Sequence, residues 1–315
     1  MARRKYSAKK RMNKIEPSVM TLTFATASQS AGATLTNYID LSQVASLLNR
    51  RFYRQGINWA VAGFKFSSLK AGVINIKKLP NTWVMSNAWE KGFRAWQKMN
   101  QQALEETPSV RPRFLDFKVY ADHTHAVNGK AANLLPLSAA GIPATPGEWE
   151  MSEVYTPNGP NFPGNTTNFE ILATGANFQG AGASALDSVS LIEGYAASRG
   201  LPNVVDPNAP DDALDADGST PENWLAAMFN EGTDQDSEVL EDMITKNNLA
   251  PYPFENDGVN LDTMYPGGAN QLSGLQWHDI CQLYSASGVP GTGIGTVRGK
   301  GGNFPCGLIK LEWTT

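Results

Sequence analysis

The sequence predicts a mainly β protein: a single antiparallel jelly-roll sandwich with helical and long-loop insertions and a disordered basic N-terminal arm. Segments that alternate apolar and polar residues occur from residue 18 to residue 313. These segments are separated by long loops rather than by regular crossover helices. This arrangement disfavours a doubly wound α/β fold. The 315 residues include 29 Gly and 19 Pro for turns, and 8 Trp, 9 Tyr and 13 Phe for a packed core.

Residues 1–17 are predicted to be the arm, and residues 18–315 the single folded domain. The opening sequence MARRKYSAKKRMNK has no apolar period with which to pack. It has no acidic residue, and its cations are Arg3, Arg4, Lys5, Lys9, Lys10, Arg11 and Lys14. Because the whole chain has a net charge of −4, a cationic tail is joined to an acidic body.

The first half of the body is predicted to hold strands and two helices. The segments that alternate like half-buried strands are 18–26, 57–67, 72–77 and 114–120. The apolar phase of the second one shifts at Gly63, as a β-bulge would produce. A short helix is expected over 40–48 with Asp40 as its N-cap. A longer helix is expected over 87–105, whose apolar face holds Trp89, Phe93, Trp96 and Leu104.

The second half is predicted to be rich in loops. Residues 128–165 and 250–305 read as mostly loop, with strands at 168–173, 189–195 and 307–313. The last strand builds the C-terminus into a sheet. An acidic insertion over 206–246 is expected to contain two short helices, one after Pro221 and one across 238–246. Its carboxylates are Asp206, Asp211, Asp212, Asp215, Asp217, Glu222, Glu231, Asp234, Asp236, Glu238, Glu241 and Asp242.

The basic arm is the strongest functional signal. Its cations suit phosphate neutralisation, and Tyr6 suits stacking on a base. The plainer interpretations are a nuclear-localisation signal or a solubilising tail. A second basic group, Lys91, Arg94 and Lys98 on the long helix, is either another nucleic-acid contact or a solvated face, and the solvated face is favoured.

No metal site or cofactor is predicted. The pair His123 and His125 in DHTH has the spacing of zinc ligands, but no third ligand is apparent nearby. DALDADG at 212–218 resembles a calcium loop, but the EF-hand frame places Ala213 first and Trp224 twelfth. A solvated acidic loop is favoured there over a looser calcium site. Cys281 and Cys306 alone form no disulfide scaffold, which favours a reducing compartment.

Catalytic and membrane signatures are also missing from the sequence. G-x-S-x-G, H-E-x-x-H, P-loop and C-x-x-C motifs do not occur, and GTGIG at 291–295 lacks the strand and helix of a dinucleotide site. The apolar runs are shorter than the 18 or so residues that a membrane span needs. The chain is therefore expected to be neither an enzyme nor a membrane protein.

Several segments carry a resemblance to a known family. WVMSNAWEKGFRAWQKMNQQAL (83–104) followed by SVRPRFLDFKVYAD (109–122) resembles the capsid proteins of small circular Rep-encoding single-stranded DNA viruses. So do NNLAPYP (247–253), YPGGANQ (265–271) and PCGLIKLEW (305–313). The nearest likeness is to smacovirus-like or unclassified environmental and stool-associated lineages. The arm is shorter than circovirus arms and mixes Lys with Arg, which argues against a close circovirus relationship.

The resemblance implies self-assembly into an icosahedral shell that packages a circular single-stranded DNA genome. The arm cations would then face inward, bind the genome and serve nuclear import through a host receptor. The protein would occur in the virion and, during assembly, in the host nucleus, with a cell-surface receptor as a further partner. The alternatives are a jelly-roll coat protein of a small single-stranded RNA virus, a non-viral β-sandwich carbohydrate-binding module, and a β-rich glycan hydrolase. The acidic 206–242 stretch is expected on the exterior or at a symmetry axis.

Overall fold

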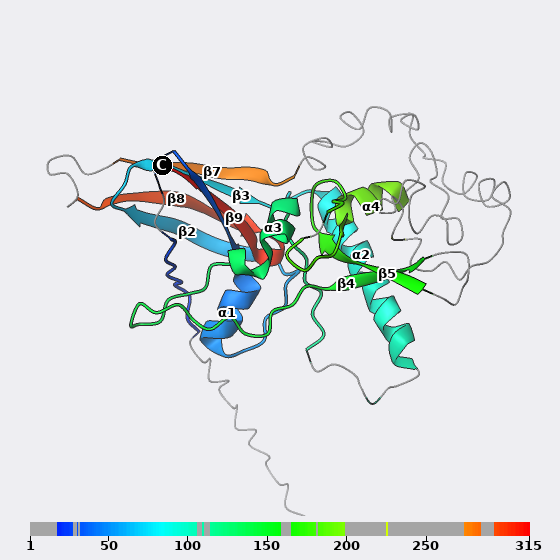
Figure 1. The fold of residues 1–315 in the computed structure, drawn as a ribbon. Coiled ribbons are helices and arrows are strands. Elements are labelled where there is room, and N and C mark those ends of the chain that lie inside the picture. The colour runs from blue at the N-terminus through cyan, green and yellow to red at the C-terminus, as the bar shows by residue number, and fades with distance from the viewer. Residues whose placement is uncertain are drawn as a thin grey trace, which may run out of the picture.

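The protein is mainly β, as the sequence predicts. The computed structural model describes residues 18–27, 30, 32–105, 109, 114–158, 165–180, 182–198, 225, 274–284 and 293–315. Within these residues, strands outnumber helices and the sheets are almost entirely antiparallel. Figure 1 shows two β layers stacked on each other, with helices α2 and α4 and the β4–β5 pair to one side of them.

One layer is a four-stranded antiparallel sheet in the order β1-β9-β3-β7. Its strands are β1 (Thr34–Asp40), β9 (Leu308–Thr314), β3 (Gly72–Lys78) and β7 (Gln276–Leu283). The last strand of the chain therefore lies inside the sheet, between β1 and β3, which confirms the prediction of a strand there. The two strands at the edges of this sheet are β1 and β7.

The other layer is the antiparallel pair of β2 (Trp59–Ser68) and β8 (Gly295–Phe304). A shared core lies between the layers. Ile74, Ile76 and Ile309 from the four-stranded sheet pack in one cluster with Phe304 and the half-buried Phe64 of the two-stranded sheet. This is the arrangement of a β-sandwich, in which alternate residues of each strand face the other sheet.

A second core holds the helices and the remaining strands. It is built by α2 (Trp83–Glu105), α4 (Leu191–Ser198) and the three-stranded sheet of β4 (Glu153–Asn158), β5 (Asn165–Leu172) and β6 (Ser188–Ser190). β6 pairs with β5 in parallel, which is the exception to the antiparallel pattern. Trp96 on α2 lies against Phe117, with ring centroids 5.3 Å apart.

The antiparallel pairs are nested along the chain. β1 pairs with β9, β2 with β8, β3 with β7, and β4 with β5. Consecutive strands from each end of the chain alternate between the two layers of the sandwich. The fourth pair, β4–β5, is not hydrogen-bonded to β2–β8 within the described residues, and it lies with β6 beside α2.

The two helices predicted in the first half of the body were correct in kind but differ from the prediction in their bounds. Asp40 caps α1 (Leu41–Asn49) by accepting hydrogen bonds from the backbone N–H groups of Ser42 and Gln43, as predicted. The long helix begins at Trp83, four residues before the predicted start at Asn87, where Thr82 accepts a hydrogen bond from the Met85 N–H.

The strand predicted over 189–195 was wrong over most of its length. It is a short strand, β6, followed directly by α4. The Ser190 hydroxyl accepts a hydrogen bond from the Glu193 N–H at 3.4 Å, which begins a helix where the apolar run suggested a strand.

Two further predicted strands, 18–26 and 114–120, form no continuous ladder with a neighbouring strand within the described residues, and Tyr120 makes only an isolated parallel bridge to Leu172 of β5. The alternation of 18–26 places Met20, Leu22 and Phe24 on one face, but Met20 is 87% exposed. Leu22 and Phe24 pack against the sandwich core, and Phe117 and Val119 are buried. The backbone groups are satisfied elsewhere. For example, the Val119 N–H donates to the Gln55 side chain at 2.7 Å. Alternation reports burial, but a ladder also needs a strand beside it.

Two strands, β7 and β8, lie in the 250–305 segment that was interpreted as mostly loop, and residues 250–273 and 285–292 of that segment lie outside the described residues. β8 contains the run GKGG at 299–302, which suggested a loop. A Cβ at Gly301 would lie 2.2 Å from the Ala62 carbonyl oxygen, so a residue without a side chain is needed there. The expected bulge at Gly63 is also absent: Val61 pairs with Gly302 and Gly63 with Lys300, in one unshifted register.

The 128–165 segment, predicted to be loops, begins at the last residue of α3 (His123–Asn128). It contains a 3-10 turn at Gly129–Ala132 and β4 near its end. The acidic insertion and its two helices lie outside the described residues, apart from Leu225, which is helical and buried. Among the described residues, no helix has the length and apolar character to span a membrane.

Candidate nucleic-acid interface

The predicted arm cations Arg3, Arg4, Lys5, Lys9, Lys10, Arg11 and Lys14 lie outside the described residues. The point at which the arm joins the body is described. The backbone N–H of Val19 donates a hydrogen bond to the Asn49 side-chain oxygen at 2.7 Å. Asn49 is the last residue of α1. The arm is therefore attached to the body at the C-terminal end of α1.

A cationic surface lies on the outer face of the β2–β8 sheet. Lys65 and Arg298 are direct cross-strand partners, so their side chains leave the same face. Both are exposed, and neither forms an ion pair with a described residue. Like charges directly opposite each other are unfavourable in a sheet. An anionic group bound between them would remove that repulsion.

Lys300 extends this surface by one further cation. It follows Arg298 at the spacing of two residues, which keeps both on one face. Its backbone N–H donates to Asp279 at 2.7 Å, while its side chain is 82% exposed and its Nζ lies 4.0 Å from the same carboxylate. The hydrogen bond from Lys300 lowers the pKa of Asp279, which stays ionised and joins β7 to β8.

The chemistry of this face suits phosphate groups and not base edges. Positive charge on this face of the sheet comes from the exposed side chains of Lys65, Arg298 and Lys300. The neighbouring cross-strand pair, Ser67 and Thr296, adds two hydroxyls that lie 3.3 Å apart. Such contacts position a nucleic acid but do not read its sequence.

The basic group on α2 is engaged within the protein. Arg94 forms an ion pair with Glu90 at 2.5 Å, one helical turn away. Lys91 donates to the Ser198 hydroxyl at 2.6 Å and so links α2 to α4. These contacts favour the interpretation of a structural, solvated helix face over that of a second nucleic-acid contact.

The DHTH segment forms a buried structural node. Asp122 caps α3, and its carboxylate also accepts hydrogen bonds from Tyr38 at 2.6 Å and Lys310 at 2.8 Å. His125 is fully buried and its ring stacks on that of Tyr38 at 3.9 Å. His123 lies at the exposed start of the helix. The two imidazoles therefore do not lie on the same side, as ligands of one zinc ion would.

Both nitrogens of His125 have protein partners. Nδ1 accepts a hydrogen bond from the Ala121 N–H at 3.2 Å. Nε2 therefore carries the proton and donates to the side-chain oxygen Oδ1 of Asn133 at 2.8 Å. Burial lowers the pKa of His125 to about 4, so the ring is neutral near pH 7. With both nitrogens engaged, this imidazole has no lone pair for a metal ion.

Lys310 on β9 is a charged residue that is almost completely buried. Its side chain is buried beneath α3 and lies between Asp122 and Glu312, the latter at 3.3 Å from Nζ. Burial alone would raise the pKa of Asp122. The attraction of Lys310 and the hydrogen bonds outweigh burial, and the pKa of Asp122 is lowered.

A second buried carboxylate, Asp40, has no cation beside it. One oxygen accepts from the backbone N–H and hydroxyl of Ser42, and the other accepts from Trp149 Nε1 at 2.8 Å and Gln55 Nε2 at 3.2 Å. Burial raises the pKa of Asp40, and these hydrogen bonds oppose that rise. The group joins β1, α1 and the 149 loop, which is a structural role.

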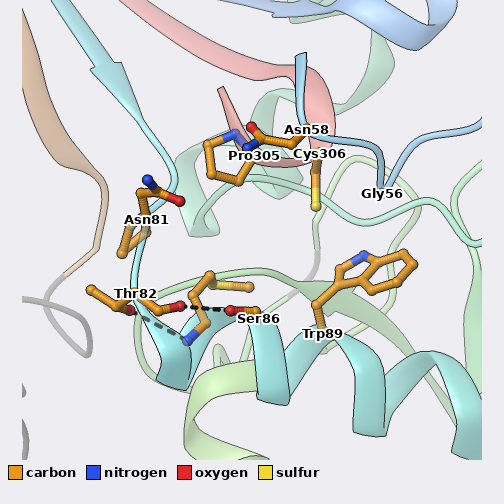
Figure 2. Close-up of a pocket in the computed structure, with 10 residues that line it drawn as sticks. Gly56, Asn58, Asn81, Thr82, Ser86, Trp89, Pro305 and Cys306 are labelled. Carbon is orange, nitrogen blue, oxygen red and sulfur yellow. Dashed lines mark hydrogen bonds between the residues drawn. The ribbon is translucent and has the colours of Figure 1, made fainter. Parts of the chain in front are cut away.

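A pocket of about 220 Å³ separates α2 from the turn between β8 and β9. Figure 2 shows Ser86 and Trp89 on α2 facing Pro305 and Cys306 across it. Its remaining lining residues are Gly56, Asn58, Pro80, Asn81, Thr82 and Met85. None of these side chains is acidic, basic or an imidazole, so the pocket has no general acid or base.

Cys306 does not supply a reactive thiolate to this pocket. Its backbone has a left-handed φ of 56° at the turn into β9. Burial raises the pKa of the thiol to about 12, so the sulfur stays protonated near neutral pH. The indole Nε1 of Trp89 is buried there without a hydrogen-bond partner.

The comparisons with known proteins add no assignment. No family model, curated protein or solved structure matches the chain. In the part of the chain that the structure describes, no three His, Cys, Asp or Glu side chains are grouped to hold a metal ion. The DALDADG segment lies outside the described residues.

Sequence reasoning missed the cationic sheet face. Lys65 and Arg298 are far apart in the sequence, and only the register of β2 against β8 makes them partners. The segment containing Arg298 had also been interpreted as loop. An alternation of exposed Thr296, Arg298 and Lys300 with smaller or apolar residues was the available signal.

Proposed function

We propose that this chain is a structural capsid protein that self-assembles into an icosahedral shell and packages a circular single-stranded DNA genome. The observation that carries the proposal is the nested pairing of β1–β9, β2–β8, β3–β7 and β4–β5 in a body joined to a cationic arm. The pairing of eight strands in this order supports a jelly-roll path, and jelly rolls form viral shells. The displaced β4–β5 pair is a variation on that path.

The fold by itself does not separate a coat protein from a lectin, because both use jelly rolls. Charge supports the coat protein. The cations of the arm and the pair Lys65 and Arg298 suit the phosphates of a packaged genome. The role proposed is structural and not catalytic, within the virion and, during assembly, within the host nucleus.

Self-assembly has support from the edge strand β7. Trp277, Ile280 and Tyr284 at this edge are large apolar or aromatic side chains that are exposed in the single chain. An exposed sheet edge with such residues is suited to contact another protein surface. In a shell, that surface would belong to a neighbouring copy.

Electron microscopy of the purified recombinant protein tests the proposal, together with the nucleic-acid-to-protein absorbance ratio of the same fraction. We expect uniform spherical particles with excess nucleic-acid absorbance, in which nuclease typing identifies DNA. Particles that contain only RNA would instead support the RNA-virus coat protein. A nucleic-acid-free monomer or small oligomer across a range of salt and pH would overturn the capsid proposal.

A further inference from the structure

An arginine-aromatic surface follows directly after α1. It consists of the consecutive residues 50–54, with the sequence RRFYR, and of Phe114 from a distant part of the chain. Arg50 has left-handed backbone angles, with φ 48° and ψ 38°, and ends the helix. From there the chain continues with Arg51, Phe52 and Arg54 all exposed.

The aromatic rings of this surface face solvent as a pair. Phe52 is 38% exposed and Phe114 is 62% exposed. Their ring centroids lie 5.1 Å apart with a tilt of 51°. Exposed phenylalanines held together in this way leave ring faces and edges available to another flat group.

Two guanidinium groups lie over aromatic rings of the 50–54 segment. The Cζ of Arg54 lies 5.9 Å from the centroid of Phe52, and that of Arg51 lies 5.9 Å from the centroid of Tyr53. Within the described residues, neither these two arginines nor Arg50 forms an ion pair. Arg54 exerts only a longer-range attraction on the buried Asp116. Positive charge is therefore available beside the exposed rings.

The surface is also continuous with the attachment point of the arm. Asn49, which binds the Val19 N–H, is the residue directly before Arg50. The described start of the body, at Val19, therefore lies next to residues 50–54.

The geometry points to a binding site for single-stranded nucleic acid, in which bases stack on Phe52 and Phe114 while Arg50, Arg51 and Arg54 hold the phosphates. Unpaired bases offer π-faces to aromatic rings, whereas a duplex hides those faces and offers chiefly phosphates. The identity of the biological ligand rests on the proposed packaging function. The preference for single strands rests on this surface alone.

Binding of labelled oligothymidylate to the full-length chain, measured by fluorescence anisotropy, tests the inference against a duplex of the same length. Phe52→Ala/Phe114→Ala is expected to weaken single-strand binding at least about fivefold, the loss of one stacked base. Duplex binding should stay unchanged, because the arm and its charges are intact. Tyr155→Ala, which removes an aromatic ring on β4 that is 46% exposed, is the matched control and should bind like the wild type.

A charge variant separates stacking from phosphate contacts. Arg50→Gln/Arg51→Gln/Arg54→Gln is expected to reduce the dependence of single-strand affinity on log salt by up to about two, whereas the double phenylalanine variant leaves that slope intact. Ultraviolet crosslinking of the wild type is a second readout that needs no variant. It is expected to mark the tryptic peptides 52–54 and 114–118.

Several outcomes would overturn the inference. These are unchanged oligothymidylate binding in the double phenylalanine variant, an equal loss for the duplex, or crosslinks confined to other peptides. Binding of anionic vesicles that is lost in this variant while oligothymidylate binding persists would assign the surface to membranes instead. Particles that form and carry nucleic acid while Phe52→Ala/Phe114→Ala binds normally would refute this site and leave the capsid proposal standing. Loss of single-strand binding in the double phenylalanine variant, when the wild type forms no particles, would support this site and refute the capsid proposal.

Discussion

Buried charged side chains in this protein each lie beside specific partners. Lys310 on β9 binds Asp122 at the start of α3, and Tyr38 on β1 binds the other oxygen of that carboxylate. A buried ion pair adds little stability compared with an apolar pair of the same shape. Removal of one partner is costly, because the other charge remains buried.

Lys310→Ala should therefore lower the free energy of unfolding by about 3–5 kcal/mol, measured by urea denaturation. Lys130→Ala is the control, because the Lys130–Glu150 pair has side chains that are 58% and 73% exposed. Exposed pairs contribute at most about 1 kcal/mol. Equal, small losses for both variants would show that Asp122 is not a buried, dependent charge.

His125 makes stability depend on pH. Its pKa is lowered by burial from 6.5 to about 4, so between these values the unfolded chain takes up a proton that the folded chain excludes. The contribution of neutral His125 to the free energy of unfolding is fully present above pH 6.5. It falls as the pH decreases towards 4, by up to about 3 kcal/mol. His125→Gln should flatten this part of the unfolding free energy against pH.

The comparison needs the difference between two curves, because other groups titrate as well. Burial raises the pKa of Asp40, so its protonation favours the folded state as the pH falls, opposite to His125. Subtraction of the His125→Gln unfolding free energy from that of the wild type, at each pH, removes the contribution that Asp40 makes to both proteins. His123→Gln, at the exposed neighbouring position, should keep the wild-type slope. Parallel curves for wild type and His125→Gln would contradict the assignment.

At the scale of the element, β8 shows how glycine makes a strand possible. Gly299 faces Ile76 and Cys281 of the opposite sheet, where an added Cβ would lie 3.1 Å from the Ile76 side chain and 3.0 Å from the sulfur. Gly301 lies against the backbone of β2. The absence of side chains lets the layers and strands approach closely. Glycine usually weakens a strand, which is why the run suggested a loop.

Gly301→Ala is expected to destabilise the protein by at least about 1–3 kcal/mol, the usual cost of an overpacked site. The new methyl group would meet the carbonyl oxygens of Val61 and Ala62, which are backbone atoms that cannot rotate away. Gly147→Ala is the matched control, because its Cβ would meet only Leu47 at 3.4 Å. Thermal or urea unfolding measures both. A neutral Gly301→Ala would mean that β2 and β8 are farther apart than described.

At the scale of the whole molecule, charge is separated along the chain. The arm is cationic, the β2–β8 face carries Lys65, Arg298 and Lys300, and the 206–242 stretch is acidic. In the proposed shell, this separation draws the genome to the inner side and repels other nucleic acid from the outer side. The placement of the acidic stretch on the exterior or at a symmetry axis remains a prediction.

Deletion of residues 2–14 should leave the body folded and sharply reduce the nucleic acid packaged per particle. The deleted residues contain the seven arm cations and lie before the Val19–Asn49 contact. The absorbance ratio of purified particles measures the content, and circular dichroism checks the fold. Unchanged nucleic-acid content per particle would refute the role of the arm.

The sequence by itself determined the features that depend on neighbouring residues. The Asp40 cap of α1, the helix containing Trp96, the alternation of β2, β3 and β9, and the polarity of the arm follow from local patterns of size and charge. Alternation also placed Leu22, Phe24, Phe117 and Val119 on the buried side, although Met20, on the same predicted face as Leu22, is exposed.

Only the tertiary structure decided the features that depend on distant partners. It paired Lys65 with Arg298, buried Lys310 beside Asp122, brought Phe114 to Phe52, and gave the glycine-rich β8 a strand to pair with. Among the described residues, it also left 18–26 without a ladder partner and 114–120 with only the single bridge from Tyr120 to Leu172. The physical reason is the same in each case. Hydrogen-bond ladders, ion pairs and ring contacts form between residues that meet in space, and a single local pattern is compatible with several such neighbours.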